Sequence, residues 1–515
     1  MRRTLDHMID MKYFRTILIL LVLIIFRAPS PAQDTLTRTW FPDPAEVFDT
    51  PTLSLPAGMA DFARIEAWLE GRAARDANMT LEKVPAPVSG GFLPLVRFSD
   101  GSQGPKLKVW FQGAIHGNEP ASAEGLFALM DALHGDPAIL RQADVYILPI
   151  ANMDGYLAGK RVSGSGYDLN RDQTKFADPV SVLLKNLFFR VSPDVAVDFH
   201  EYNPVRKELT ERGLISYYDV LFLPTGHPAV PAPLRKAVLD HLVAPARSAL
   251  DKAGYSYFNY FTINSEGAEL ALVMGARSPQ SSSTSYSLSG AVSMLVEIRG
   301  IGLGRTALAR RTDATRTVAL AILQEISDRP DAFRKAVAKA RKEVLRGRTP
   351  VTAAFHSREV RRDVTFLDTR SAERKVLPDM LVRDALQPVS DRVRPRPAAY
   401  VLEASQTRAI ENLRTLGLEL EILSEPCEMW VESYQVTDYS EDPALWEKIR
   451  RQTVRTHTFR QKVRFEAGSA IIRVRQSHGS YAVAVLEPET ENGFVHFRVI
   501  DTYLGAILPV HRLQQ

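Results

Sequence analysis

Two histidines and one glutamate stand at positions that suit a metal-binding site. His116 and Glu119 lie in the run His-Gly-Asn-Glu, and His200 ends the run Val-Asp-Phe-His much further along the chain. Two imidazoles and one carboxylate form a ligand set for zinc that leaves the fourth coordination position open. An open position accepts water or substrate, so this set predicts a hydrolase with one Zn²⁺ per chain.

The elements expected around these residues bring them together. His116 follows residues 106–115, an apolar run typical of a buried strand, and His200 follows a similar run at 194–199. Glu119 precedes a proline, which suits the first position of a helix. Open α/β sheets bind ligands at the carboxyl ends of their strands. We therefore expect the three side chains to converge at that edge.

Strand and helix patterns alternate between residues 105 and 345. Further strands are expected over 143–150 and 293–298, and helices over 121–133, 180–190, 233–253 and 305–343. This alternation predicts an α/β fold with a mixed, mostly parallel sheet flanked by helices.

Composition changes along the chain suggest five segments. We expect a signal peptide over 1–32, an N-terminal segment over 33–89, a catalytic domain over 90–345, a linker over 346–398 and a smaller C-terminal α+β domain over 399–515. The linker is rich in Arg and Pro and is expected to contain short strands. In the last segment we expect a helix over 406–423 and strands over 429–436 and 470–486.

An apolar run of eleven residues, Thr16–Phe26, follows Lys12 and Arg15 and precedes Ser30-Pro-Ala32. This layout is typical of a secretory signal peptide cleaved after Ala32. The alternative is an uncleaved anchor, but the run is shorter than the roughly 20 residues that cross a bilayer. We therefore expect export to the periplasm or the medium, with membrane contact only through this segment.

The rest of the composition is that of an ordinary globular protein. Most of the formal net charge of +4 comes from residues 1–32, so the mature chain offers no electrostatic reason to bind nucleic acid. Cys427 is the only cysteine, which excludes an intrachain disulfide and a thiolate metal cluster. The oligomeric state is not indicated by any feature of the sequence.

Five short motifs occur in the order found in the zinc metallocarboxypeptidase (funnelin) family. They are Gly-Ala-Ile-His116-Gly-Asn-Glu119, Leu148-Pro-Ile-Ala-Asn-Met-Asp-Gly-Tyr156 (with Met153 where the family has Pro), Asp168-Leu-Asn170-Arg171, Asp198-Phe-His200 and Ser293-Met-Leu-Val-Glu297-Ile-Arg-Gly. Residues 90–320 thus resemble this family, and 485–511 resemble the tails of some bacterial members. The resemblance implies a secreted bacterial member with an extra C-terminal region, zinc ligands His116, Glu119 and His200, and a peptide substrate with a free C-terminal carboxylate.

Glu297 is an acid inside the otherwise apolar run Met-Leu-Val-Glu-Ile. Burying an unpaired carboxylate is costly, so a functional role is expected; the alternatives are pairing with Arg299 or exposure to solvent. The resemblance implies that Glu297 is the general acid/base, which takes a proton from the zinc-activated water and delivers it to the leaving amine.

Arg171 and Asn170 are expected to bind the substrate carboxylate. A guanidinium group binds a carboxylate through two parallel hydrogen bonds, and the Asn170 amide adds a donor. The alternative is a surface Arg171 paired with Asp168 or Asp172.

Two further residues are assigned through the resemblance. It implies that Arg161 stabilises the oxyanion, with the neighbouring Lys160 as the alternative. It also implies that Tyr286, in the Ser-rich loop 278–290, closes over the substrate; the alternative is an ordinary loop tyrosine. Glu201, beside His200, should point away from its neighbour in a strand and is expected to be structural.

Three functions are compatible with these residues. The first is removal of C-terminal residues from peptides. The second is a zinc-dependent amidase or deacylase that acts on N-acyl amino acids or cell-wall peptides, since an N-acyl amino acid also has a free carboxylate. The third is a binding protein with an inactive site, which the intact set of expected ligands, base and carboxylate anchor opposes.

Overall fold

The computed structural model describes residues 31–514 except 88–90, 135–136 and 267–268. Residues 1–30, with the apolar run of the expected signal peptide, lie outside the described residues. Among the helices that are described, none is long and apolar enough to cross a membrane.

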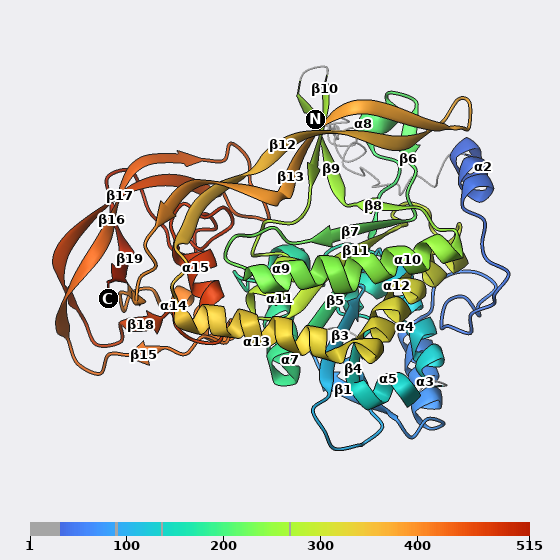
Figure 1. Ribbon diagram of the computed structural model, residues 1–515, viewed down its shortest axis with the longest axis horizontal. Helices are drawn as coiled ribbons and strands as arrows, with labels where there is room; N and C mark the ends of the chain where they lie inside the picture. Colours follow the sequence, from blue (N-terminus) through green and yellow to red (C-terminus); the bar gives the residue numbers. More distant parts are fainter. Residues whose placement is uncertain (1–30, 88–90, 135–136, 267–268, 515) are drawn as a thin grey trace, which may run out of the picture.

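An eight-stranded mixed sheet forms the centre of residues 79–299 (Figure 1). Its order is β1 (Met79–Pro85), β2 (Phe92–Phe98), β4 (Ala143–Leu148), β3 (Leu107–Gly113), β5 (Val195–Tyr202), β11 (Val292–Arg299), β7 (Val220–Pro224) and β8 (Tyr257–Asn259). The central neighbours β4, β3, β5 and β11 run parallel, and antiparallel pairs lie on both sides of them. The expected α/β class with a mostly parallel sheet is confirmed.

Helices cover both faces of this main sheet, as expected for parallel strands. They include α3 (Phe62–Ala73), α4 (Pro120–Leu133), α5 (Pro137–Gln142), α7 (Pro179–Val191), α9 (Ala232–Val238), α10 (Ala244–Ala253), α11 (Ser282–Leu288), α12 (Leu308–Asp328) and α13 (Pro330–Arg346). Successive residues of β3 point to opposite faces. Trp110 packs on Phe188 of α7, and Gln112 accepts a hydrogen bond from Tyr286 of α11. These two residues share one face, whereas Gly113 faces the other side and lies against the backbone of α4.

Residues 351–394 form two long strands, where we expected a linker with short ones. β12 (Val351–Asp368) and β13 (Arg374–Arg394) pair with each other and join β6 (Leu214–Ser216), β10 (Glu269–Met274) and β9 (Phe261–Glu266) in a five-stranded sheet. Figure 1 shows this hairpin, in orange, running along the top of the view, above β7 and β8. The expectation of short strands was wrong because a strand tolerates these arginines: all those of β12 and β13 except Arg394 lie on exposed or half-buried positions.

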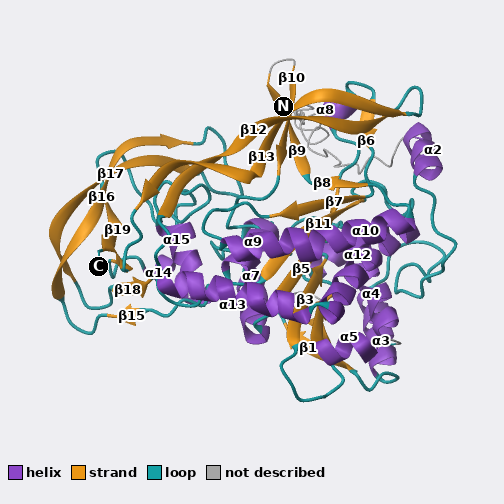
Figure 2. Cartoon of the chain, in the orientation of Figure 1, coloured by secondary structure: helices purple, strands orange, loops and turns teal. Residues whose placement is uncertain are grey.

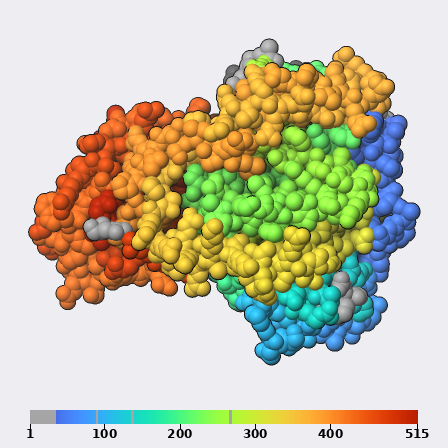
Figure 3. Space-filling view, in the orientation of Figure 1, coloured from blue at the N-terminus to red at the C-terminus, as the bar shows by residue number. Residues whose placement is uncertain are grey.

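The described part of the C-terminal region, residues 399–514, contains a six-stranded antiparallel sheet and two helices (Figure 2). Figure 3 shows this region, in orange and red, at the left of the view. The strand order is β15 (Glu421–Ile422), β18 (Ala470–Arg473), β14 (Ala399–Leu402), β19 (Ile507–Leu513), β16 (Cys427–Glu441) and β17 (Gln452–Phe465), and the helices are α14 (Thr407–Thr415) and α15 (Gly479–Leu486). The α+β class is confirmed. The strand expected over 470–486 stops at Arg473, and the apolar run after it forms α15 instead. All of α15 is buried, and a short apolar run does not distinguish a buried strand from a buried helix.

Lys185 is fully buried where α7, α11 and α15 meet. Its Nζ donates to Ser285 Oγ at 2.7 Å, and this hydroxyl lies 3.0 Å from the hydroxyl of Tyr481. Burial lowers the pKa of the Lys185 ammonium to about 7. The rings of Tyr286 and Tyr481, at 5.2 and 5.8 Å, favour the charged form and offset part of this cost.

We expect Lys185→Met to raise the unfolding temperature more at low pH than at high pH. An unfolded lysine titrates near pH 10.4, so between about pH 7 and that value the unfolded chain binds more protons than the native one. The contribution of Lys185 to wild-type stability therefore rises with pH through this window, and the penalty removed by the substitution is largest below about pH 7. Thermal unfolding of both proteins from about pH 6 to about pH 9 measures the difference, with the exposed Lys236→Met as a control. A difference that does not change with pH would contradict a titrating Lys185.

Candidate active site

The structure brings His116, Glu119 and His200 to one point. One ligand atom from each lies within 4.8 Å of the others, and all three residues are buried. Nδ1 of His116 is 2.8 Å from Oε1 of Glu119, and Nδ1 of His200 is 3.0 Å from Oε2 of the same carboxylate. The expected convergence is therefore present.

The local backbone explains this convergence. His116 lies in the tight connection after β3, where Gly117 packs so closely on Gly155 that an added Cβ would lie 1.8 Å from its carbonyl carbon. Glu119 is the residue directly before α4, and His200 lies near the carboxyl end of β5. The carboxyl ends of β3 and β5 and the start of α4 therefore place all three side chains at the same edge of the main sheet.

Each histidine is oriented by an aspartate that sequence reasoning did not assign. Nε2 of His116 is 3.0 Å from Oδ1 of Asp168, and Nε2 of His200 is 3.0 Å from Oδ2 of Asp198. A proton on each Nε2 can be donated to the aspartate, which leaves the Nδ1 lone pair for a metal ion. For Asp198 a signal existed, because it precedes His200 by two residues in a strand and so shares its face.

The donor chemistry of this group fits a metal cation. The two Nδ1 atoms are 3.1 Å apart. When both Nε2 protons are committed to the aspartates, neither Nδ1 can donate to the other or to Glu119. Three electron-rich groups then face one another, and a cation between them removes the repulsion. Two imidazole nitrogens and a carboxylate form a set that zinc accepts.

We expect Asp198→Asn to weaken zinc binding by about 10- to 100-fold. The amide cannot accept the His200 Nε2 proton as strongly as a carboxylate does, so the ring is less basic and less well oriented. Competition with a chromophoric chelator measures the affinity. Asp76→Asn is the matched control, because Asp76 makes a similar contact, at 2.9 Å, with His134, which does not belong to this group. Equal zinc affinity in wild type and Asp198→Asn would contradict the orienting role.

Glu297 lies on β11 directly beside His200 on β5. The residue is 9% exposed. Burial raises the pKa of its carboxyl, and the neighbouring His200 acts in the opposite direction. No ion pair in the described part of the chain joins Glu297 to Arg299, which donates to the backbone oxygen of Ser216 instead. The two alternatives to a functional Glu297, pairing with Arg299 and full exposure, are therefore not found.

Arg161 approaches the His–Glu–His group from the side of Asp168. Its Nε and Nη2 contact Oδ2 of Asp168 at 2.9 and 2.8 Å, and its Nη1 is 3.6 Å from Oε1 of Glu119. The side chain is 39% exposed, so part of the guanidinium faces solvent. Lys160, the alternative cation, is exposed. The cation beside the group is thus Arg161.

Asn170 and Arg171 lie in a short 3-10 turn, Leu169–Arg171. Oδ1 of the buried Asn170 accepts from the backbone N–H of Ser282 at 2.8 Å, so only its NH₂ group remains to donate to a ligand. Arg171 is partly exposed and donates from Nη1 to the backbone oxygen of Asn170. Among the described residues no ion pair joins Arg171 to Asp168 or Asp172. Its guanidinium is therefore largely available for a ligand.

Tyr286 does not lie where we expected it. Residues 282–288 form the helix α11, and the Tyr286 side chain is 1% exposed beneath it. Its hydroxyl donates to Oε1 of Gln112 at 3.0 Å, and its ring stacks on Phe188 with centroids 4.1 Å apart. The expectation of a mobile loop tyrosine was wrong because this side chain is part of the packing between α7, α11 and the main sheet.

Tyr260 is the tyrosine beside the candidate site, and sequence reasoning missed it. It follows β8, partly buried, and burial together with the charge of Glu297 raises its pKa, whereas Arg206 and Arg171 lower it. Its backbone N–H donates to Phe222 of β7 at 2.8 Å, and its side chain packs with Leu295, so Tyr260 lies next to β11, the strand that carries Glu297. The only signal was an aromatic run, Tyr257–Phe261, which carries no motif of its own.

Glu201 has the structural role expected of it. Its carboxylate forms a buried ion pair with Arg311 and accepts from the backbone N–H of Ala121. This pair ties β5 to α12 and to the start of α4, which carries Glu119 at its amino end.

The C-terminal region covers the segment that carries the expected substrate anchor. We call residues 163–175 the anchor segment. Nζ of Lys448 donates to the backbone oxygen of Ser165 at 3.1 Å and lies 3.7 Å from the ring centroid of Tyr167. Oε2 of Glu447 accepts from the backbone N–H of Asp168 at 3.4 Å. The connection between β16 and β17 therefore contacts the residue that orients His116.

Lys175, a buried residue of the anchor segment, adds to the contact with the C-terminal region. Nζ of Lys175 has no hydrogen-bond acceptor in the described structure, but it lies 3.6 Å from Oδ1 of Asp172. The ring centroids of Tyr167, Trp446 and Phe497 lie 5.7, 6.0 and 5.7 Å from it. Two of these rings come from the C-terminal region, so that region helps to hold the anchor segment in place.

Comparison with known proteins adds to this geometry. A family model described as zinc carboxypeptidase matches residues 65–182, a stretch that includes His116, Glu119 and the anchor segment. Carboxypeptidase 2 of Trichophyton rubrum is 26% identical over 465 residues, which cover 88% of this chain and 85% of that protein. Carboxypeptidase 2 of Trichophyton equinum is 28% identical over 415 residues, covering 79% and 77%.

Among solved structures, a metallo-carboxypeptidase from Burkholderia cenocepacia aligns with 17% identity and a TM-score of 0.41, over 52% of this chain and 69% of that one. The family match and the two Trichophyton relatives support an enzyme of the metallocarboxypeptidase class. The expected bacterial source and the resemblance of residues 485–511 to bacterial tails remain predictions.

Proposed function

We propose that this protein is an exported zinc carboxypeptidase that removes single residues from the C-termini of peptides. The observation that carries the proposal is the buried His116–Glu119–His200 group with Glu297 beside it on the neighbouring strand. The family match and the names of the relatives support cleavage at peptide C-termini and do not favour the amidase or deacylase alternative.

Each residue has a defined task in this proposal. His116, Glu119 and His200 hold one Zn²⁺, which when bound lowers the pKa of a water molecule and polarises a carbonyl group. Glu297 takes the proton from the attacking water and passes it to the amine that leaves. Arg161 stabilises negative charge on the scissile carbonyl oxygen.

The anchor segment binds the terminal carboxylate of the substrate. Arg171 holds the terminal carboxylate through its guanidinium group, and the NH₂ group of Asn170 donates to the same carboxylate. Tyr260 takes the place we had assigned to Tyr286, because it packs beside β11, which carries Glu297. A free carboxylate distinguishes a chain end from any internal peptide bond, so this anchor makes the enzyme an exopeptidase.

The sequence alone supports three further proposals, on export and on domain boundaries. Residues 1–32 are a cleaved signal peptide that exports the chain to the periplasm or the medium. Residues 90–345 are the catalytic domain, preceded by an N-terminal segment over 33–89. Residues 399–515 are a separate α+β domain, joined to it through residues 346–398.

A panel of substrates tests the reaction. We would assay zinc-loaded protein on N-blocked dipeptides, on their C-terminal amides and on N-acyl amino acids. The proposal requires cleavage of the free dipeptides and little or no cleavage of the amides. Preferred cleavage of N-acyl amino acids would overturn it in favour of a deacylase.

The contact with the C-terminal region predicts an effect of Trp446 on substrate binding. Trp446→Ala removes one ring around Lys175 and loosens the anchor segment, so we expect KM for free dipeptides to rise by about tenfold with a smaller change in kcat. The matched control is Trp430→Ala, because Trp430 is 56% exposed on β16. Unchanged KM in Trp446→Ala, or an equal rise in Trp430→Ala, would contradict the positioning role.

A further inference from the structure

Five arginines line one hollow of about 800 Å³. Arg346 and Arg348 lie at the end of α13, Arg394 and Arg396 at the end of β13, and Arg475 follows β18. The other residues that line the hollow are apolar residues and a glycine, and none is acidic. Three segments far apart in the sequence thus bring guanidinium groups to one concave surface.

The backbone at the end of α13 explains how these segments meet. Gly347 ends the helix in the left-handed conformation, with φ of +59°. A Cβ at this position would lie 2.8 Å from Cγ of Arg475. The side chain of Arg475 therefore lies directly against the turn that carries Arg346 and Arg348, and only a glycine permits this approach.

Among the described residues, carboxylates form ion pairs with only one of the five arginines. Arg394 pairs with Glu487 and Glu489. No ion pair of the described residues involves Arg346, Arg348 or Arg475. An arginine cluster without acidic partners is unfavourable, because like charges repel one another.

Arg396, which is half-buried, also lacks a full set of acceptors for its guanidinium group. Its Nε donates to the backbone oxygen of Thr349 at 2.8 Å, but its Nη1 is buried without any acceptor. Burial lowers the pKa of this guanidinium. A buried donor of a charged group without a partner is costly, and an anion in the hollow would supply acceptors for the group.

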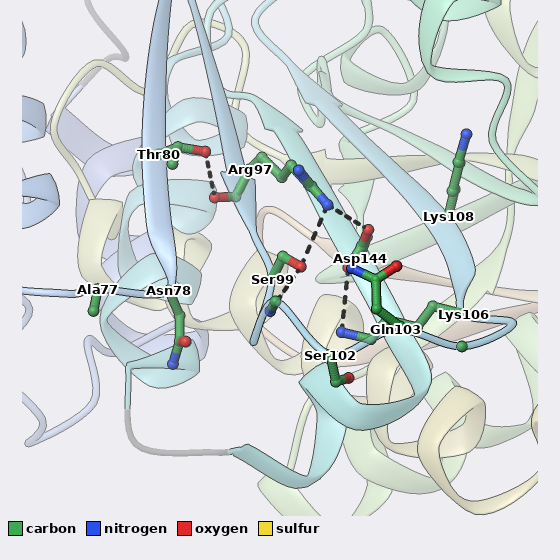
Figure 4. A pocket seen from close by; sticks show the side chains of 12 residues that line it. Ala77, Asn78, Thr80, Arg97, Ser99, Ser102, Gln103, Lys106, Lys108 and Asp144 are labelled. Atoms are coloured by element: carbon green, nitrogen blue, oxygen red, sulfur yellow. Dashed lines mark hydrogen bonds and ion pairs between the residues drawn. The ribbon is translucent and has the colours of Figure 1, made fainter.

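A second polar hollow provides a contrast. It measures about 450 Å³ and is lined by residues that include Arg97, Lys106 and Lys108 (Figure 4). There the protein supplies the partners: Arg97 pairs with Asp144 at 2.8 Å, and Lys106 pairs with Asp100. Lys108 donates to a backbone oxygen. The arginine hollow differs because it has cations and almost no counter-charge.

We propose that the arginine hollow binds an anion that carries at least two phosphate or carboxylate groups, held by Arg346, Arg348, Arg396 and Arg475. Guanidinium groups suit such ligands because their planar donors bind two oxygens at once. The volume lies in the usual range of ligand sites. The hollow uses none of the residues of the candidate active site, so this inference does not depend on the proposed reaction.

Titration calorimetry with inorganic triphosphate tests the proposal on the full-length protein at low ionic strength. We expect saturable binding at one site per chain. The double variant Arg348→Ala/Arg475→Ala should weaken it by about tenfold or more, because each charge-assisted hydrogen bond contributes strongly. The matched control is Arg464→Ala/Arg473→Ala, which removes exposed arginines paired with Glu466 and Glu421 and should change binding less than about twofold.

A second arm distinguishes the sources of the anion. Co-sedimentation with vesicles that contain an anionic phospholipid reports binding to a lipid headgroup, whereas binding to triphosphate alone indicates a soluble anion. Thermal unfolding verifies that both double variants fold. The proposal is overturned if the wild-type protein binds neither triphosphate nor anionic vesicles, or if both double variants lose binding equally.

Discussion

Glu297→Gln is expected to lower kcat for the hydrolysis of N-blocked dipeptides by about a thousandfold. Glutamine has the size and shape of glutamate, but it can neither take a proton from water nor deliver one to the leaving amine. KM should change little, since Glu297 is not among the residues proposed to bind the substrate carboxylate.

Zinc content separates this chemical effect from damage to the metal-binding group. Glu297 contributes no atom to the His116–Glu119–His200 group, so Glu297→Gln should retain one zinc per chain. His200→Ala should lose both zinc and activity. A Glu297→Gln enzyme that keeps most of its kcat would exclude Glu297 as the proton carrier.

Arg171→Ala is expected to lower kcat/KM for free dipeptides by about 10²- to 10³-fold, the effect of removing one partner of a desolvated charge pair. The guanidinium of Arg171 forms no ion pair with a carboxylate of the described chain, so its loss should leave no protein charge unpaired. Thermal stability should therefore remain close to that of the wild type.

Amidated substrates provide the internal control for Arg171. They lack the terminal charge, so Arg171→Ala should affect their slow hydrolysis much less and the preference for free acids should shrink. Arg171→Lys should recover only part of the activity, because lysine keeps the charge but not the two-pronged geometry. An equal loss for acids and amides would indicate that Arg171 acts on the fold of the anchor segment and not on the carboxylate.

The positions of the expected metal ligands were predictable because they depend on local rules. A histidine after a buried strand, a glutamate before a helix-starting proline and a histidine at a second strand end are placed by secondary structure alone. The order of parallel strands then brings β3 and β5 together. Glu297 was predictable for a similar reason, since an acid in a buried strand needs a partner or a function.

The positions that were not predictable depend on tertiary contacts. Tyr286 was assigned to a loop because serine is frequent there, but the pocket between Phe188 and Gln112 buries the ring and stabilises a helix. Tyr260 lies next to β11, which carries Glu297, only because β8 pairs with β7 and β7 pairs with β11. The arginines of β12 and β13 suggested a linker, whereas pairing with β10 and β6 produces long strands.

Mass spectrometry of the products from a peptide of about ten residues tests directly whether this protein is a zinc carboxypeptidase. The protein is assayed zinc-loaded, after removal of zinc with a chelator, and after one equivalent of zinc is returned. We expect stepwise loss of single C-terminal residues, no products after chelation and recovery with zinc. Cleavage at internal bonds, or unchanged cleavage by the zinc-free protein, would contradict it.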